Sequence, residues 1–287
     1  MTLAQTYRGE PCDLMVALHA RRSFPAIDQF RRLHPMCPLI VALTGTDLYG
    51  DIKTSVEAQK SLELATRLIV LQPKGIEELP SHLHTKTWVI YQSVVGPKRP
   101  LEKSKTTFDV CVLGHLREVK DPFRTAFAAR LLPETSRIRV LHVGKALSED
   151  MMATAQAEAN LNSRYHWLGE LKRWRARGVL ARSHISVLSS KMEGGANVIS
   201  EALAVPVPVL ASRISGSIGL LGEEYPGYFA VGDTQTLAQL LEQAECDAVF
   251  YQTLAERCQR LAPLVHPGRE REAWRCLLQE LNDCRYS

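Results

Sequence analysis

The sequence predicts an α/β protein built from two successive doubly wound parallel sheets. Two observations predict it: short apolar runs alternate with longer helical patterns, and this alternation stops and then restarts along the chain. Runs such as PLIVAL and RLIVL are almost continuously apolar, which is typical of strands in a parallel sheet covered on both faces. The 287 residues suffice for one large or two ordinary domains.

The first domain is expected over residues 1–100. Its strands are predicted at Leu14–Leu18, Leu39–Leu43, Arg67–Leu71 and Thr87–Tyr91, and its helices at Phe24–His34, Thr54–Ala65 and Gly75–Leu79. A doubly wound domain usually opens with a strand, a glycine-rich turn and a helix. We expect this domain to lack that N-terminal strand–loop–helix, with Thr2–Gln5 as a remnant edge strand.

The stretch Gly96–Lys105 is the best linker, because it holds two prolines and several basic residues without an apolar period. A second domain is then expected over residues 105–265, and a helix over residues 268–283 is expected to cross back to the first domain. The second domain's strands are predicted at Asp109–Leu113, Arg137–Val143, His184–Leu188 and Val207–Leu210, and its helices at Pro122–Leu131, Glu149–Ala159, Leu171–Ala181, Asn197–Ala204, Thr234–Ala244 and Ala248–Leu261.

Composition and charge narrow the class of protein. The chain is 45% hydrophobic and 23% charged, so it can bury real cores and is not disordered. A net charge of +4 suits an anionic small substrate and does not demand nucleic acid. The arginines at 173, 175 and 177 favour a solvated helix face over an RNA site.

The cysteines and the apolar runs indicate the compartment. Seven cysteines occur without a CxxC pair or metal-ligand spacing, which indicates reduced thiols. No run approaches about 18 consecutive apolar residues. We therefore expect a cytoplasmic protein without membrane insertion.

The segment EGGANVISE, from Glu193 to Glu201, is the most informative motif. Gly194 and Gly195 precede a short helical run, and the free N–H groups at such a helix start favour a phosphate. Glu201 shares a helix face with Asn197, four residues before it, and its carboxylate can accept hydrogen bonds from sugar hydroxyls. The alternative is a chance pair of glutamates beside a common Gly-Gly turn.

A second motif, GHLREVKDP, follows the first strand of the second domain. The strand ends at Gly114, and Arg117 and Lys120 lie beyond its carboxyl end, where open α/β sheets bind ligands. A guanidinium and an ammonium group can neutralise a diphosphate and stabilise a departing nucleotide. The alternative is a solvated loop with two basic residues.

Both motifs, the LGEL step at residues 168–171 and the final helix resemble the retaining GT-B glycosyltransferases of family 4. The resemblance implies two facing Rossmann-like domains. It also implies that Arg117 and Lys120 hold the donor diphosphate beside Gly114, that Glu201 holds the ribose hydroxyls, and that Glu193 lies near the transferred sugar. The backbone of residues 194–197 (Gly194, Gly195, Ala196 and Asn197) would grip sugar and phosphate.

Other segments give a narrower resemblance. DLMVALHARRS (13–23), PLIVALTGTDLY (38–49) and ASRISGSIGLLGEEYPGYFAVGD (211–233) are similar to the SenB-type selenosugar synthases of selenoneine biosynthesis. This resemblance implies that a sugar moves from UDP-N-acetylglucosamine or UDP-glucose to selenophosphate. A carbon–selenium bond forms, and loss of the phosphate leaves a 1-seleno sugar.

Three residues at the end of the first strand are candidates for the acceptor side. His19 comes before Arg21 and Arg22, and we interpret it as a contact to the sugar or the acceptor. The two arginines are candidate ligands for the acceptor phosphate, since an ionised nucleophile needs cations more than a base. The alternative is a histidine that caps a helix beside surface arginines.

Two further loops are weaker candidates for the acceptor. Thr44, Thr46 and Asp47 follow another strand end, and they either bond sugar hydroxyls or cap the next helix. Arg213 and the polar run Ser215–Ser217 form either an acceptor loop or an ordinary turn.

Two tryptophans of the second domain offer rings for the base. Trp167 and Trp174 either stack on uracil or pack in the core. Core packing is the more common fate of such residues, and we expect it here.

Three other functions fit the same donor motifs: an ordinary family 4 O-glycosyltransferase, a nucleotide-sugar 2-epimerase, and a non-catalytic nucleotide-sugar-binding protein. We expect no metal and no cofactor, because the cations do the neutralising. We expect no nucleic-acid partner. An exposed edge of the first sheet could pair with a second copy and give a homo-oligomer.

Overall fold

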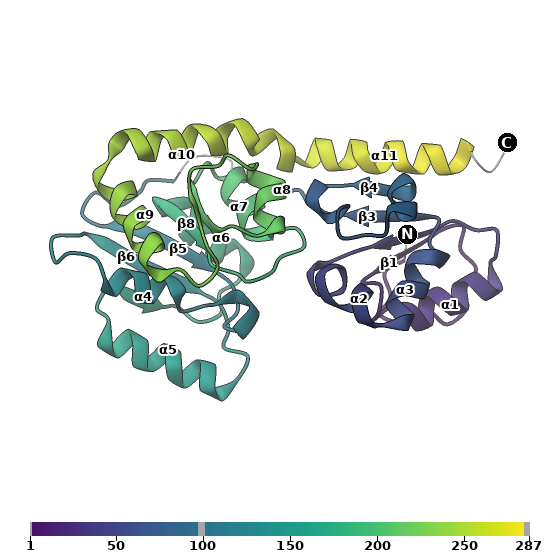
Figure 1. The fold of residues 1–287 in the computed structure, drawn as a ribbon, viewed down its shortest axis with the longest axis horizontal. Helices are drawn as coiled ribbons and strands as arrows, with labels where there is room; N and C mark the ends of the chain where they lie inside the picture. Colours follow the sequence, from purple (N-terminus) through teal and green to yellow (C-terminus); the bar gives the residue numbers. More distant parts are fainter. Residues whose placement is uncertain (1, 97–100, 284–287) are drawn as a thin grey trace. The chain divides into compact units, whose positions relative to one another are not determined.

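The computed structural model describes residues 2–96 and 101–283, which divide into two units (Figure 1). The first unit comprises Met1–Gln92, Glu193–Gly195 and Gly268–Ser287, and the second comprises Ser93–Met192 and Ala196–Pro267. Residues 97–100 of the expected linker lie outside the described residues. No helix among the described residues combines the length and the apolar character that a membrane crossing requires.

The first unit holds a parallel sheet of four strands in the order β1-β2-β3-β4. Its strands are β1 (Met15–Leu18), β2 (Leu39–Ala42), β3 (Arg67–Val70) and β4 (Thr87–Val89); its helices are α1 (Phe24–Leu33), α2 (Ile52–Thr54), α3 (Val56–Leu64) and α11 (Pro267–Asp283), with the short turns η1 (Asp47–Asp51), η2 (Pro73–Gly75) and η3 (Ser81–Lys86). The helix expected over Gly75–Leu79 was wrong: the 3₁₀ turn η2 ends at Gly75, and residues 76–79 are not helical. The remnant strand at Thr2–Gln5 was also wrong, since these residues form no strand.

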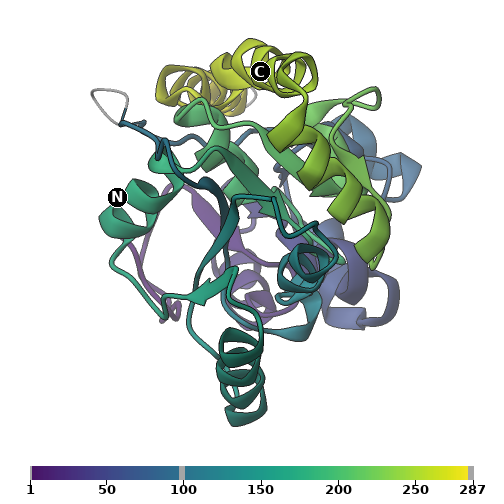
Figure 2. The same ribbon diagram turned by 90° about the vertical axis from the view of Figure 1, so that its left-hand side faces the viewer.

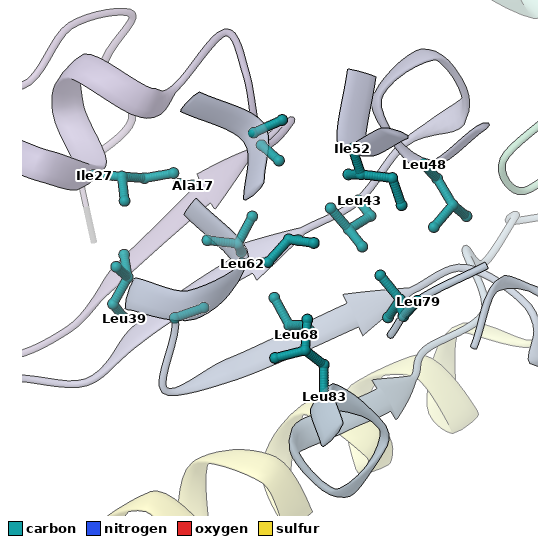
Figure 3. Packing of buried hydrophobic residues seen from close by; sticks show 14 of the residues in the cluster. Ala17, Ile27, Leu39, Leu43, Leu48, Ile52, Leu62, Leu68, Leu79 and Leu83 are labelled. Atoms are coloured by element: carbon teal, nitrogen blue, oxygen red, sulfur yellow. The ribbon is translucent and has the colours of Figure 1, made fainter. Parts of the chain in front are cut away.

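Both faces of this sheet are covered, which explains its apolar runs. Along β2, Leu39 and Val41 belong to the core cluster that includes Ile27 of α1 and Leu62 of α3 (Figure 3). The alternate β2 residues, Ile40 and Ala42, belong to a second cluster with side chains of α11. Because successive side chains of a strand point to opposite faces, every residue of β2 is buried. The prediction of a parallel sheet covered on both faces is confirmed.

Helix α11 belongs to the first unit through this second cluster. Leu277 and Leu281 are buried against Ile40 and Ile69. Arg67 of β3 donates from Nε to Glu280 Oε1 at 2.9 Å, which fixes the helix along the sheet. The other side of α11 is polar, as its sequence PGREREAWRCLLQELND predicts for an amphipathic helix.

We expect Leu277→Ala to destabilise the first unit by about 3 kcal/mol, because it removes a fully buried side chain and leaves a cavity. Leu278→Ala is the matched control, since Leu278 is 39% exposed. Urea unfolding of both variants measures the difference. Equal loss of stability in the two variants would contradict the packing of α11 on this sheet.

The second unit holds a parallel sheet of six strands in the order β10-β9-β8-β5-β6-β7. Its strands are β5 (Phe108–Leu113), β6 (Ile138–Val143), β7 (Tyr165–Trp167), β8 (Ile185–Leu188), β9 (Val209–Ser212) and β10 (Tyr228–Phe229); its helices are α4 (Arg124–Arg130), α5 (Glu149–Leu161), α6 (Arg173–Arg182), α7 (Asn197–Ala204), α8 (Ser215–Leu221), α9 (Thr234–Cys246) and α10 (Ala248–Leu261), with the turns η4 (Glu118–Lys120) and η5 (Ala262–Val265). Figure 2 shows α5 projecting away from the other helices of this unit.

Chain order reverses within this sheet. From β5 the chain runs outward through β6 and β7, then returns to place β8 on the other side of β5 and continues to β9 and β10. The two halves therefore diverge between the carboxyl ends of β5 and β8. This is the topological switch point at which open α/β sheets bind their ligands.

Three parts of the second unit differ from the sequence-based expectation. The strands β7 and β10 were not predicted. The strand expected at Val207–Leu210 lies two residues later, because Pro208 has no N–H to donate to the sheet. The polar loop expected at Ser215–Ser217 is the first turn of α8, in which Gly216 and Ser217 are buried.

Candidate functional site

A small hollow lies at the switch point of the second unit. Its lining includes Gly114 after β5, Lys120 of η4, and Ser189 and Ser190 after β8. Gly114 leaves space there, because a Cβ on it would meet only the Lys120 side chain, at 4.0 Å. The structure thus brings the predicted residues Gly114 and Lys120 together at the end of the central strand.

Hydrogen bonds within the turn and from Ser189, after β8, hold the turn that carries Arg117 and Lys120. The Lys120 N–H donates to the Arg117 carbonyl at 2.9 Å, which closes the 3₁₀ turn. Ser189 Oγ lies 3.2 Å from the Lys120 carbonyl and 2.9 Å from that of Asp121. Asp121 adopts the left-handed conformation, at φ 45°, and Arg124 pairs with it at 2.8 Å. Arg117 is exposed and Lys120 half-buried on this anchored turn.

The loops after β5 and β6 approach each other too closely for a side chain at Gly144. A Cβ there would lie 1.8 Å from the Gly114 carbonyl oxygen. Next to it, Leu116 and Ala146 form a parallel bridge, and the Lys145 N–H donates to His115 Nδ1 at 3.0 Å. Sequence reasoning missed Gly144 and Lys145; a glycine directly after an apolar strand was the available signal.

His142 of β6 ties these loops to the sheet. Its Nε2 lies 3.2 Å from the Gly114 carbonyl oxygen, and its Nδ1 lies 2.9 Å from the Tyr165 hydroxyl. Burial lowers the pKa of His142 to about 4, and the hydrogen bond to Gly114 opposes this shift. The neutral ring therefore donates from Nε2 to Gly114 and accepts from Tyr165 at neutral pH.

We expect the pH dependence of stability to report His142. As pH falls, the unfolded chain takes up a proton near the ordinary histidine pKa of 6.5, whereas the folded chain does so only near 4. The contribution of neutral His142 is therefore fully present above pH 6.5 and is lost as pH falls towards 4, by up to about 3 kcal/mol. Urea unfolding between these pH values, compared with His142→Gln, measures it. The same slope in both proteins would contradict this interpretation.

Helix α7 begins after Ala196, an N-cap residue whose own side chain makes no capping hydrogen bond. Ala196 is left-handed at φ 30° and buried, and its carbonyl accepts the Ile199 N–H at 2.7 Å. Asn197, the first helical residue, is exposed. This arrangement is favourable for an anion.

Glu201, further along α7, lies in an ion-pair network. Arg177 of α6 donates from Nε to Glu201 Oε1 at 3.2 Å, and the Arg173 Nε lies 3.9 Å from the same oxygen. Glu201 and both arginines line a cavity of about 480 Å³, together with Trp174 and Leu101. The prediction of a solvated face was therefore wrong for Arg177, which is only 25% exposed.

Glu193, Gly194 and Gly195 group with the first unit, whereas Glu201 belongs to the second. A Cβ on Gly194 would lie 2.6 Å from the backbone of Thr44 and Gly45, and one on Gly195 would lie 2.6 Å from Leu71. The two glycines are therefore needed for close packing against these residues. Glu193 is half-buried and has interaction partners of its own.

The first unit gathers its predicted polar residues at the carboxyl ends of β1 and β2. His19 is buried in the left-handed conformation, at φ 74°, a strained state for a residue with a side chain. Its Nδ1 accepts the Arg22 N–H at 3.3 Å, so Nε2 is the nitrogen that donates to Thr46 Oγ1, at 3.0 Å. A side-chain hydrogen bond thus joins His19 to Thr46.

Asp47 is fully buried beneath this pair. Its carboxylate accepts the N–H groups of Ala20 and Thr44, and the Thr44 hydroxyl, each at 2.8 Å. The chain itself satisfies these oxygens, so Asp47 joins the two loops rather than offering a hydrogen bond to an acceptor. Of the two alternatives for Asp47, this favours a structural role over a contact to the acceptor.

Arg21 and Arg22 differ in their surroundings. Arg21 is half-exposed and its Nε lies 3.2 Å from Asp51 Oδ2, which also lies 3.6 Å from His19 Nε2. The Arg22 side chain is exposed, and its backbone N–H donates to His19 Nδ1. Sequence reasoning missed Asp51, which lies four residues after Asp47 on the same turn, η1.

The remaining candidates of the second unit have partners within it. Arg213 pairs with Glu223 at 2.9 Å and lies over the Tyr228 ring. Trp167 is half-buried and donates to the Gly144 carbonyl at 2.8 Å. The expectation of core packing was wrong for Trp174, which is 67% exposed.

The family follows from a comparison with known domains. The model for "Glycosyl transferases group 1" matches residues 97–262, which is more than half of the chain. The chain belongs to this family. The match spans the anchored Arg117–Lys120 turn, the switch-point hollow and helix α7. A search of curated protein sequences gave no match to this glycosyltransferase.

Solved structures show the same fold. HepE of Anabaena with UDP-glucose has a TM-score of 0.75 at 18% identity, over 93% of this chain and 79% of that one. Sucrose-phosphate synthase of Thermosynechococcus elongatus has a TM-score of 0.74 at 17% identity, over 95% and 74%. TarM has a TM-score of 0.71 at 16% identity, over 94% and 54%. The predicted GT-B fold class is confirmed.

Proposed function

We propose that this glycosyltransferase moves a sugar from a UDP-sugar, UDP-N-acetylglucosamine or UDP-glucose, to selenophosphate. The observation that carries the donor half is the anchored turn at the switch point of the second unit. It presents Arg117 and Lys120 beside the open space at Gly114. Two cations at the carboxyl end of a central strand suit a diphosphate. The HepE structures, solved in complex with UDP-glucose and with UDP, support a uridine nucleotide.

The start of α7 adds to this donor site. Its N–H groups and the positive end of its dipole favour the donor phosphates, and Glu201 on the same helix is the proposed ribose ligand. Arg117 and Lys120 then stabilise the charge that grows on UDP as it departs. Glu193 is proposed to contact the transferred sugar.

The acceptor assignment is supported by sequence segments of both units and by the chemistry of selenophosphate. This ionised selenium nucleophile needs little help from a base, and the loop after β1 presents Arg21 and Arg22 beside His19. In the reaction, a selenium lone pair forms the bond to the anomeric carbon. The bond from that carbon to the UDP oxygen breaks, and UDP leaves with the electron pair. Water then cleaves the selenium–phosphorus bond, which releases phosphate and the 1-seleno sugar.

Incubation with each UDP-sugar and selenophosphate tests the proposal. We expect UDP release that depends on selenophosphate, and a product whose mass spectrum shows the selenium isotope pattern. Release of UDP only with alcohol or sugar acceptors would instead establish an O-glycosyltransferase. A change of the donor sugar without any acceptor would establish an epimerase, and donor binding without turnover a binding protein.

We expect Lys120→Met to lower kcat/KM by about 10²-fold, because it removes a charge that stabilises the leaving diphosphate. Lys105→Met is the matched control, since Lys105 is exposed before the opposite end of β5. Steady-state measurement of UDP release with both variants checks this. A Lys120→Met enzyme as active as the control would contradict the role of this turn.

A further inference from the structure

Arg177 connects three parts of the second unit: α6, α7 and the segment that contains Val95. From α6 it donates to Glu201 Oε1 of α7 at 3.2 Å, and its Nη1 donates to the Val95 carbonyl at 3.4 Å. The two side chains are largely covered, at 25% exposure for Arg177 and 18% for Glu201. A covered pair of opposite charges is screened less than a surface pair, so it restricts the carboxylate more strongly.

The other arginines of α6 lack this placement. Arg173 reaches only 3.9 Å from Glu201 Oε1 and is 73% exposed. Arg175 is exposed and lies over the Trp174 ring at 5.1 Å, and it does not line the cavity. A general need for basic residues on this helix does not explain why Arg177 is covered and directed at one carboxylate.

Arg177 and Arg173 both approach the same oxygen of the Glu201 carboxylate, Oε1. Among the described residues, the hydrogen bond and both ion pairs of Glu201 fall on Oε1. A carboxylate has two oxygens, each able to accept more than one hydrogen bond, so Oε2 keeps its capacity for donors. Glu201 lines the cavity of about 480 Å³ together with Val94 and Trp174. An alcohol donor bound in this cavity would find an acceptor of fixed orientation.

We propose that Arg177 is a positioning residue that holds Glu201 for the ribose diol of the nucleotide donor. This inference rests on the proposed function, in which Glu201 binds the ribose. Arg177 does two things there: it fixes the rotamer of Glu201, and it offsets a negative charge that would otherwise repel the diphosphate. The pair thereby makes the site selective for a ribonucleotide over a deoxyribonucleotide, because a missing hydroxyl leaves Glu201 with a lost hydrogen bond.

The test compares the Kd values of UDP, 2′-deoxy-UDP and 3′-deoxy-UDP by isothermal titration calorimetry. We expect the wild-type protein to bind UDP at least tenfold more tightly than either deoxy analogue. In Arg177→Gln all three Kd values should rise, because the charge is lost, and that of UDP should rise about tenfold more than those of the analogues, so the preference approaches one. Arg177→Lys, which keeps the charge but loses the Nε contact, should show an intermediate preference. Arg175→Gln, the matched control on the same helix, should keep the wild-type preference.

Each outcome decides one claim. If Arg177→Gln and Arg177→Lys both keep the wild-type preference, or if Arg177→Gln binds UDP more tightly, Arg177 does not position Glu201 and the inference is overturned while the donor class stands. If the wild-type protein binds UDP without discriminating against the analogues, the ribose contact itself is absent and the inference also fails. If the wild-type protein does not bind UDP, the proposed function fails with it. Circular dichroism of each variant separates loss of folding from loss of preference, and Arg177→Lys serves if Arg177→Gln does not fold.

Discussion

The reversal of strand order between β5 and β8 is the constraint on which the second unit depends. It separates two loops that would otherwise close over the sheet, and it leaves the carboxyl ends of two adjacent strands open to a ligand. The turn with Arg117 and Lys120 fills this position because the Ser189 hydroxyl, from the far side of the opening, bonds its carbonyls. The placement of the cations is therefore a property of the topology as much as of the motif.

Buried polar groups organise the loops in both units. In the first unit, Asp47 joins the loops after β1 and β2. In the second unit, neutral His142 holds the Gly114 carbonyl, and the close approach at Gly144 leaves no room for a side chain. Such groups are costly to bury unless they are hydrogen-bonded, so their networks fix one arrangement of the loops. The residues proposed to contact substrates lie on or beside the loops that these hydrogen bonds hold in place.

The sequence predicted the long central strands and the amphipathic helices well, for reasons that the structure makes plain. An apolar run such as that of β2 can be buried on both faces only in a covered parallel sheet. It did not predict β7, whose three residues include the exposed His166, or β10, which has two residues. The sequence also predicted a loop at Ser215–Ser217, because small polar residues are typical of turns. In the structure these residues are helical, and Gly216 and Ser217 are buried by packing rather than by their own hydrophobicity.

The sequence by itself determined the fold class and the family, and it indicated the proposed donor motif, because these depend on local patterns: apolar periodicity, a Gly-Gly step before a helix, and cations after a strand. Only the tertiary structure decided which residues support other parts of the chain rather than offering a contact to a ligand. Asp47 proved to be internal, Arg177 proved to belong with Glu201 across 24 positions of sequence, and Gly194 proved to be required by the backbone of Thr44 and Gly45. Such contacts join residues far apart in the chain, and no local pattern records them.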